Sequence, residues 1–333
     1  MQLQYIQDYF SQNIEIEQLR PGKSYDYLIQ NRNASLSELL SNPEELKKFL
    51  IVRNCPVCNY DKHSHLIKKD NLDIVQCDSC SVVYTNPVFD ENKYLEIYKG
   101  DHYQTIVKKL GEDSHIYRKN RFGKERMDFI EKFHNPKNPK SYLDIGCSTG
   151  FIIEEGKERG WDTTGIELNP SAVQFGLDRG LNIISEPLET ANLKGQFAAI
   201  SLFDVLEHLI HPKETLERVH DLLVPDGNVF IYVPNFDSAY KMLAGVENAH
   251  FIWPTHHLTY FTPLTLKYLL EKVGFEVIHW ETQGLDIFDY LWYVNENTDF
   301  DTKLMEKIGE LLQFYINAGG HGKNLRMFAR KIK

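Results

Sequence analysis

The chain has 333 residues, of which 42% are hydrophobic and 25% are charged, an ordinary composition for a globular protein. This length predicts one full domain of roughly 200 residues and a smaller one. The formal net charge of −10 argues against an extended nucleic-acid-binding surface, which needs clustered lysine and arginine. No apolar stretch approaches the ~20 residues of a membrane helix, and the N-terminus lacks a signal-peptide pattern. We therefore expect a cytoplasmic protein without a membrane span.

The first fifty residues are polar and contain two short helical patterns, Ser35–Leu40 and Pro43–Leu50. No chemical motif lies among them. We therefore predict a helical N-terminal extension over residues 1–50, which packs on a neighbouring part of the protein.

Two C-x-x-C pairs follow, separated by the eighteen residues from Asn59 to Gln76. Each pair offers two sulfurs from one tight turn, and two such turns complete a closed tetrahedral site with no position for substrate. This spacing predicts a structural Zn²⁺ in a module over residues 51–90. Disulfides are the alternative, which a cytoplasmic location disfavours; His63 and His65 could also replace a thiolate. The predicted metal ligands are Cys55, Cys58, Cys77 and Cys80.

Residues 91–135 read as a mostly helical connector, with a helix expected over Tyr117–Phe133, and residues 136–333 as the main domain. In this domain apolar strands alternate with helices, two of which begin at Asn169-Pro170 and Thr262-Pro263. This alternation predicts an α/β fold with a doubly wound, Rossmann-like, mostly parallel sheet. The last two strands, Phe275–Trp280 and Asn324–Arg330, are expected to supply an antiparallel edge strand.

The segment Tyr142–Gly150 reads as an apolar strand that runs through a glycine turn into a helix. Glycines allow a sharp turn and a close approach of the backbone to a ligand. Seventeen residues after Gly150, Glu167 ends a second apolar run, where a carboxylate can accept both ribose hydroxyls. A dinucleotide is disfavoured, because Ser148 and Phe151 replace two glycines of the G-x-G-x-x-G pattern. Taken alone, such a turn could also be structural.

The run Asp144–Gly150 resembles the first motif of the class I S-adenosylmethionine-dependent methyltransferases, D-x-G-C-x-x-G. The resemblance continues through 197–209 and 222–235, which are similar to the fourth and fifth strands of that family. It implies that Asp144 faces the methionine part of the cofactor and Glu167 its ribose, and that the connector 91–135 lies across the active site. The residues that the resemblance assigns to the cofactor are Asp144, Gly146, Cys147, Ser148, Gly150, Glu167, Leu168, Glu186, Leu188, Phe203 and Asp204.

Two of these assignments have plain alternatives. Glu186 and Leu188 occupy the place where such enzymes hold the adenine ring, but Glu186 could equally be a solvated loop charge, as could Glu189. Cys147 is expected to fill space inside the turn, because no positive partner adjoins it in sequence to activate a thiolate.

A general base near neutral pH is most easily a histidine. His208 is one candidate for this base, because it follows the fourth strand at its carboxyl end, where ligands bind in open sheets. Alternatively, His208 has a structural role and orders the loop. The segment 256–261 resembles the E-H-x-x-Y-F segment of zinc-containing sugar C-methyltransferases, in which His257 and Tyr260 match and His256 replaces the glutamate. The resemblance implies that His257 is the base, with Tyr260 beside it. The polar segment Thr282–Asp289 offers groups that could meet a polyol.

Three functions remain open from the sequence. The first is a methyltransferase for a sugar that is nucleotide-linked or part of a surface polysaccharide, which is a role in carbohydrate biosynthesis. The second is a small-molecule O-methyltransferase of the quinone or phenol kind, and the third is an inactive zinc-containing assembly protein. The sequence leaves open the acceptor, the atom methylated and the oligomeric state.

Overall fold

The computed structural model describes residues 18, 41–99, 111–193, 195–306 and 308–332, so the predicted helix Ser35–Leu40 lies outside the described residues. The second N-terminal helix is α4, Pro43–Lys47. It is shorter than predicted, because Leu50–Ile51 forms β1 and pairs antiparallel with β5, Val88–Phe89. The backbone of this stretch finds its hydrogen-bond partners in another strand, which a local helical pattern does not reveal.

A seven-stranded sheet has the order β12-β13-β10-β9-β6-β7-β8. Its five strands from β10 to β8 are parallel, while β13 runs antiparallel to both of its neighbours and β12 forms the edge. This confirms the predicted doubly wound α/β fold with an antiparallel element at that end. The strands are β6 Ser141–Ile145, β7 Asp162–Ile166, β8 Ile183–Ile184, β9 Phe197–Phe203, β10 Leu223–Pro234, β12 Phe275–Gln283 and β13 Asn324–Lys331.

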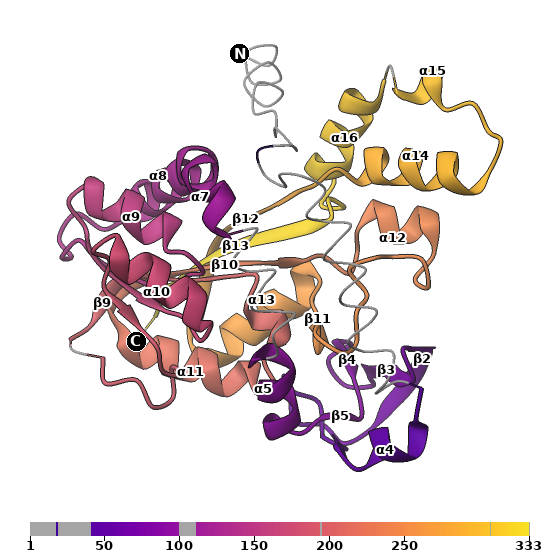
Figure 1. Ribbon diagram of the computed structural model, residues 1–333, viewed down its shortest axis with the longest axis horizontal. Coiled ribbons are helices and arrows are strands. Elements are labelled where there is room, and N and C mark those ends of the chain that lie inside the picture. Colours follow the sequence, from indigo (N-terminus) through magenta and orange to yellow (C-terminus); the bar gives the residue numbers. More distant parts are fainter. Residues whose placement is uncertain (1–17, 19–40, 100–110, 194, 307, 333) are drawn as a thin grey trace.

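Helices cover both faces of this sheet, with α8 and α9 on one side and α11 and α13 on the other (Figure 1). Two predicted helix starts are confirmed by side-chain caps, since Asn169 accepts the backbone N–H of Ala172 and Thr262 accepts that of Thr265. The helices are α8 Lys124–Phe133, α9 Phe151–Glu158, α10 Pro170–Asp178, α11 Pro212–Leu222 and α13 Pro263–Val273.

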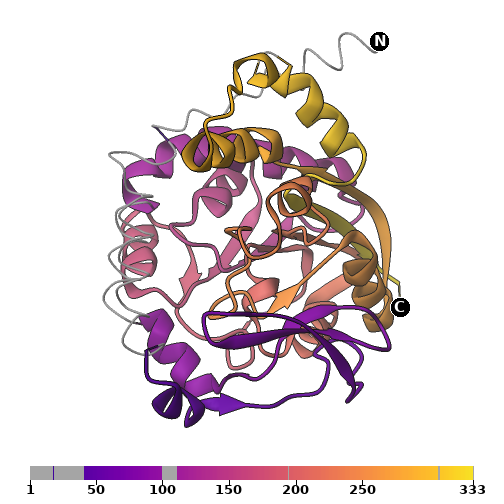
Figure 2. The same cartoon turned by 90° about the vertical axis from the view of Figure 1, so that its right-hand side faces the viewer.

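A smaller sheet has the order β11-β4-β3-β2, with one cysteine pair in the segment before β2 and the other at the turn between β3 and β4. Three strands come from the N-terminal region, β2 His63–Lys69, β3 Leu72–Cys77 and β4 Val83–Thr85, whereas β11 is Thr259–Tyr260. Figure 2 shows these N-terminal strands beside the later part of the chain. Tyr84 and Phe261 belong to one apolar cluster that also contains Leu143 of the main sheet. The two sheets therefore share a core.

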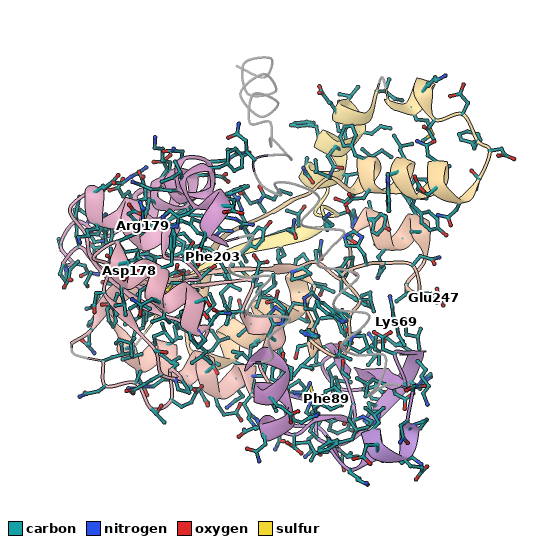
Figure 3. All side chains as sticks on the ribbon, viewed as in Figure 1. Lys69, Phe89, Asp178, Arg179, Phe203 and Glu247 are labelled. Carbon is teal, nitrogen blue, oxygen red and sulfur yellow. The ribbon has the colours of Figure 1, made fainter. Side chains whose placement is uncertain are left out.

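A second connection lies at the far end of the small sheet. The Nζ of Lys69 donates hydrogen bonds to the carbonyls of Glu247, at 3.0 Å, and Ala249, at 3.3 Å. Figure 3 labels Lys69 and Glu247, which lie across from each other at this junction. The loop before β11 is thus tied to the small sheet at both of its ends.

Three helices between β12 and β13 were missed by the sequence analysis: α14 Asp286–Asn297, α15 Lys303–Glu306 and α16 Gly309–Ala318. The expectation that this segment offers polar groups to a polyol is wrong for Asp286, whose side chain is fully buried. It accepts the backbone N–H groups of Tyr240 and Lys323, so it joins α14 to its surroundings. Among the described residues, no helix combines the length and the apolar character needed to cross a membrane.

Candidate active site

The predicted glycine turn connects β6 to α9 and has three residues with positive φ, Gly146 at 74°, Ser148 at 51° and Gly150 at 80°. A Cβ on Gly146 would lie 2.4 Å from a methyl carbon of Val205, and one on Gly150 2.6 Å from Leu181. Both glycines are therefore required by close packing as well as by backbone conformation. Val205, which follows β9, therefore packs directly against Gly146 at the start of the glycine turn.

Glu167, at the end of β7, reaches back to this turn. One carboxylate oxygen accepts the backbone N–H of Ser148 at 2.9 Å, and the other accepts those of Leu168 and Asn169, each at 2.8 Å. A carboxylate has about four acceptor positions. Three backbone donors therefore fix its orientation and leave capacity for a ligand hydroxyl, while burial raises its pKa.

Asp144 lies beneath the turn and is 2% exposed. It accepts a hydrogen bond of 2.5 Å from the hydroxyl of Ser201, which in turn contacts the hydroxyl of Tyr142 at 2.6 Å. Burial raises the pKa of Asp144 to about 6, although Ser201 opposes the shift. Its described partners are thus interior side chains, and a contact with the methionine part of a cofactor stays a prediction.

Cys147 is 2% exposed, and its sulfur fills the space beside Gly165, where a Cβ would lie 2.5 Å from it. Burial raises its pKa well above the ordinary value, which fits the predicted space-filling role. The two residues predicted for the adenine differ from each other: Leu188 is buried in the main apolar cluster, whereas Glu186 is exposed. Leu168 is 40% exposed.

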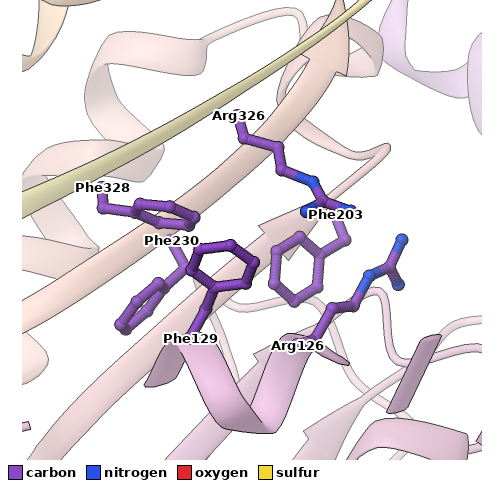
Figure 4. Close-up of a pocket in the computed structure, with 6 residues that line it drawn as sticks. All are labelled: Arg126, Phe129, Phe203, Phe230, Arg326 and Phe328. Atoms are coloured by element: carbon purple, nitrogen blue, oxygen red, sulfur yellow. The ribbon is translucent and has the colours of Figure 1, made fainter. Parts of the chain in front are cut away.

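Phe203 lines a small pocket against α8 (Figure 4), and its predicted contact with the cofactor stays a prediction. The guanidinium of Arg126 lies 4.4 Å from the centre of the Phe203 ring. Asp204, the residue that follows Phe203, is exposed. The pocket is lined by Arg126, Phe129, Phe203, Phe230, Arg326 and Phe328.

The sequence analysis missed His115, which ties the connector to the glycine turn. It lies in α7, Asp113–Arg118, is 1% exposed, and contacts the hydroxyl of Thr149 at 2.9 Å and the carboxylate of Glu154 at 2.6 Å. A π-helical turn, η3 at Lys119–Gly123, joins α7 to α8. The helical prediction over Tyr117–Phe133 is thus close to the structure. Nothing in the local sequence marked His115, because its partners are more than thirty residues away.

The structure brings His208 and His257 together, with ring centres 4.8 Å apart. His208 ends the short helix η4, Leu206–His208, immediately after Val205 at the glycine turn, and His257 lies in the loop before β11. Glu207 completes the group, because one ligand atom from each of these three residues lies within 4.8 Å of the others. Burial, together with the neighbouring His257, lowers the pKa of His208 to about 3.

Tyr260, predicted beside the base, is 3% exposed and packs in a different apolar cluster with Ile74 and Val83 of the small sheet. Its ring centre is 5.8 Å from that of Phe236. Burial raises the pKa of its hydroxyl. Tyr260 therefore contributes to the packing of the small sheet. Its predicted catalytic role stays a prediction that this geometry does not support.

The four predicted metal ligands lie together, with all of their sulfurs within 4.8 Å of one another and no disulfide between them. The Sγ atoms are 3.6 Å apart in the pair Cys55 and Cys80, and 3.5 Å apart in Cys58 and Cys77. A tetrahedron with Zn–S bonds of ~2.3 Å has edges of roughly 3.8 Å, so the donor set fits zinc. His63 and His65 are exposed and lie outside this cluster.

Comparisons with known proteins relate this chain to methyltransferases. Residues 116–280 match the family model described as a methyltransferase domain. A ubiquinone biosynthesis O-methyltransferase from Azoarcus sp. (strain BH72) is 24% identical over 187 residues, which is 52% of this chain and 80% of that protein. Its counterpart from Chromobacterium violaceum is 30% identical over 36% of this chain and 55% of its own length.

Solved structures are similar as well. A 1,6-didemethyltoxoflavin-N1-methyltransferase from Burkholderia thailandensis, with bound S-adenosylhomocysteine, covers 81% of this chain at 16% identity and a TM-score of 0.48. The alignment includes 100% of that protein.

The fold and the matched domain define a class I methyltransferase. The chain is an enzyme of the S-adenosylmethionine-dependent kind, which confirms the predicted activity and cofactor. The acceptor and the residues that hold each ligand are argued below.

Proposed function

We propose that this enzyme methylates a hydroxyl group of a small molecule, at a site formed by Glu207, His208 and His257. The observation that supports it most is the position of these side chains. Glu207 and His208 follow Val205, which packs on Gly146 of the glycine turn, and the ring centre of His257 lies 4.8 Å from that of His208. The acceptor and the cofactor would therefore lie side by side. Glu167 would accept a ribose hydroxyl at its remaining acceptor position, and the turn would approach the adenosyl group closely.

The reaction is an in-line displacement. A bond forms between the acceptor oxygen and the methyl carbon as the bond from that carbon to sulfur breaks, and the sulfonium becomes a neutral thioether. The hydroxyl proton would pass to the Nε2 of His257, because the Nδ1 of this ring lies 2.7 Å from the carbonyl of Phe251 and carries the ring's own proton. Positioning the two reactants contributes much of the rate in such a step.

We favour an acceptor of the phenol or quinone kind, because the curated relatives named above are ubiquinone biosynthesis O-methyltransferases. Trp253 adds an aromatic surface at the site, with its ring centre 6.2 Å from that of His257. A sugar is the second candidate. It is supported by the four-cysteine cluster and by the match of His257 to the base of zinc-containing sugar methyltransferases.

Transfer of labelled methyl groups to a panel of catechols, phenols and nucleotide sugars tests both candidates. We expect turnover with a catechol or phenol and little with nucleotide sugars; the opposite preference would favour the sugar. His257→Asn should lower kcat by about 10²–10⁴-fold with binding of S-adenosylhomocysteine unchanged. His211→Ala serves as control, because it removes an exposed imidazole three residues from His208. Equal turnover in His257→Asn would refute the proposed site.

A further inference from the structure

We propose that His115 is a positioning residue for the cofactor, because its imidazole holds Thr149 and thereby the shape of the glycine turn. This inference rests on the proposed function, in which that turn and Glu167 bind the adenosyl group. His115 lies in α7, outside the glycine turn, and is 1% exposed, so it would not touch the cofactor itself. It would act through Thr149.

The glycine turn contains a strained residue. Ser148 has a positive φ of 51°, which residues other than glycine adopt rarely. Such a conformation is costly and persists only where the surrounding contacts hold it. The backbone N–H of Ser148 donates to the carboxylate of Glu167 at 2.9 Å, which fixes the turn on one side. The contacts of the next residue, Thr149, fix it on the other.

The connector holds both ends of the Thr149 side chain, which is fully buried. Its hydroxyl oxygen lies 2.9 Å from the Nδ1 of His115. A Cβ on Gly111 would lie 2.8 Å from its methyl carbon, so the backbone of the connector packs directly on Thr149. The turn is therefore supported by a segment that is distant from it in the chain.

The hydrogen bonds of His115 show which of its two nitrogens accepts. The Nε2 lies 2.6 Å from an oxygen of the Glu154 carboxylate, which only accepts, so Nε2 carries the ring proton. Burial lowers the pKa of His115 below its usual value, which favours the neutral imidazole. The Nδ1 then has a lone pair, and the hydroxyl of Thr149 donates to it.

The imidazole is itself held in one orientation. Glu154 also accepts from the guanidinium of Arg179 at 2.7 Å, and the ring of Phe175 lies beside the imidazole with ring centres 5.1 Å apart. A turn that is already in the bound shape binds more tightly, because less conformational freedom is lost on binding. The series from Glu154 through His115 to Thr149 would therefore set the affinity for the cofactor and leave the transfer step unchanged.

Two substitutions of His115 separate its two hydrogen bonds. In His115→Asn the amide oxygen can replace Nδ1 and accept from Thr149, but the side chain is too short to reach Glu154. In His115→Gln the longer side chain can replace Nε2 and donate to Glu154, but the hydroxyl of Thr149 loses its acceptor. Thr149→Val removes this hydroxyl and keeps the shape of the side chain, whereas Thr149→Ser keeps the hydroxyl.

Calorimetry with S-adenosylhomocysteine on the zinc-loaded full chain measures the affinity of each variant. We expect the Kd to rise roughly 3–10-fold in His115→Gln and in Thr149→Val, because each removes the same hydrogen bond. His115→Asn and Thr149→Ser should recover an affinity close to that of the wild type. The double variant His115→Gln/Thr149→Val should bind no more weakly than either single variant, since the two residues act through one contact.

Two further measurements distinguish positioning from a general loss of stability. In His115→Gln the KM for S-adenosylmethionine should rise with the Kd, with kcat at saturating cofactor unchanged. His115→Asn should melt at a lower temperature than His115→Gln, because it loses the charged hydrogen bond to Glu154, and yet bind more tightly.

An affinity that falls in the same order as the melting temperature would overturn the proposal, because that order is what a merely structural role predicts. Wild-type affinity in His115→Gln would reject the role of His115 and leave the proposed cofactor site standing. A wild type that does not bind S-adenosylhomocysteine would reject both.

Discussion

Gly146 shows how one residue controls the cofactor turn. Its positive φ costs an L-residue about 1–2 kcal/mol, and its missing Cβ makes room for Val205. Gly160 has a similar φ of 79°, but a Cβ there would meet nothing within 4 Å. A substitution at Gly160 therefore tests backbone strain alone, whereas one at Gly146 tests backbone strain and close packing together.

We expect Gly146→Ala to lose the thermal stabilisation that S-adenosylhomocysteine gives to the wild type, because the new methyl group displaces Val205 and the turn. Gly160→Ala should lower the melting temperature slightly and keep the full ligand-induced shift, since binding to the folded state raises stability by mass action. Differential scanning fluorimetry with and without the ligand measures both. Equal shifts in the two variants would contradict this account of the turn.

At the scale of elements, α7 and η3 are held to α9 through Glu154. This carboxylate accepts from His115 and, at 2.7 Å, from Arg179, and Lys119 lies 3.7 Å away. Burial alone would raise the pKa of Glu154, but the hydrogen bonds from Arg179 and His115 lower it to about 2. A carboxylate with a lowered pKa stabilises the fold above its unfolded pKa of ~4.3 and loses that contribution as pH falls through its folded pKa.

Glu154→Gln should therefore reduce the free energy of unfolding by about 1–3 kcal/mol at pH 7. The deficit should shrink between pH 5 and pH 2, where the wild-type carboxylate takes up its proton. Urea denaturation across this range measures it. Glu158→Gln is the matched control, because Glu158 is 58% exposed and pairs with Lys119. A deficit that does not change with pH would exclude the charge as its cause.

The elements that sequence predicted well are those with a local signal. The glycine turn, the cap at Asn169 and the cysteine pairs each lie within a few residues, so spacing alone defines them. The contacts that sequence could not predict join residues far apart in the chain. The strand β11 pairs with β4 across more than 170 residues, and His115 contacts the hydroxyl of Thr149. The loop of His257 was predicted from a resemblance to carry the base, but its pairing with the small sheet has no signature in its own residues.

At the scale of the whole molecule, the cysteine cluster supports the active site. Cys55 and Cys77 are buried in the same apolar cluster as Leu206, which lies beside the proposed acceptor site. Through β4 and β11, and through Arg53, the small sheet fixes the loops that carry His208 and His257. We therefore infer that zinc at the cysteines would stabilise these loops without taking part in the reaction.

Cys58→Ser should lower the zinc content from one ion per chain and the melting temperature by roughly 5 °C or more. Methyl transfer should fall with it, because the loop of His257 loses its support, while the glycine turn still binds S-adenosylhomocysteine. Elemental analysis, fluorimetry and calorimetry measure the three effects. His65→Ala removes an exposed residue outside the cluster and should change none of them. Full activity in zinc-free Cys58→Ser would show that the module is dispensable.

The central claim is that the glycine turn, with Glu167 behind it, holds an adenosyl cofactor. Isothermal titration calorimetry of the zinc-loaded protein with S-adenosylhomocysteine, and separately with NAD, tests it most directly. We predict one molecule of S-adenosylhomocysteine bound per chain, at least ~10-fold weaker binding in Glu167→Gln because charged hydrogen bonds contribute about 1.5–3 kcal/mol, and no binding of NAD. No binding of S-adenosylhomocysteine, or tighter binding of NAD, would contradict the account.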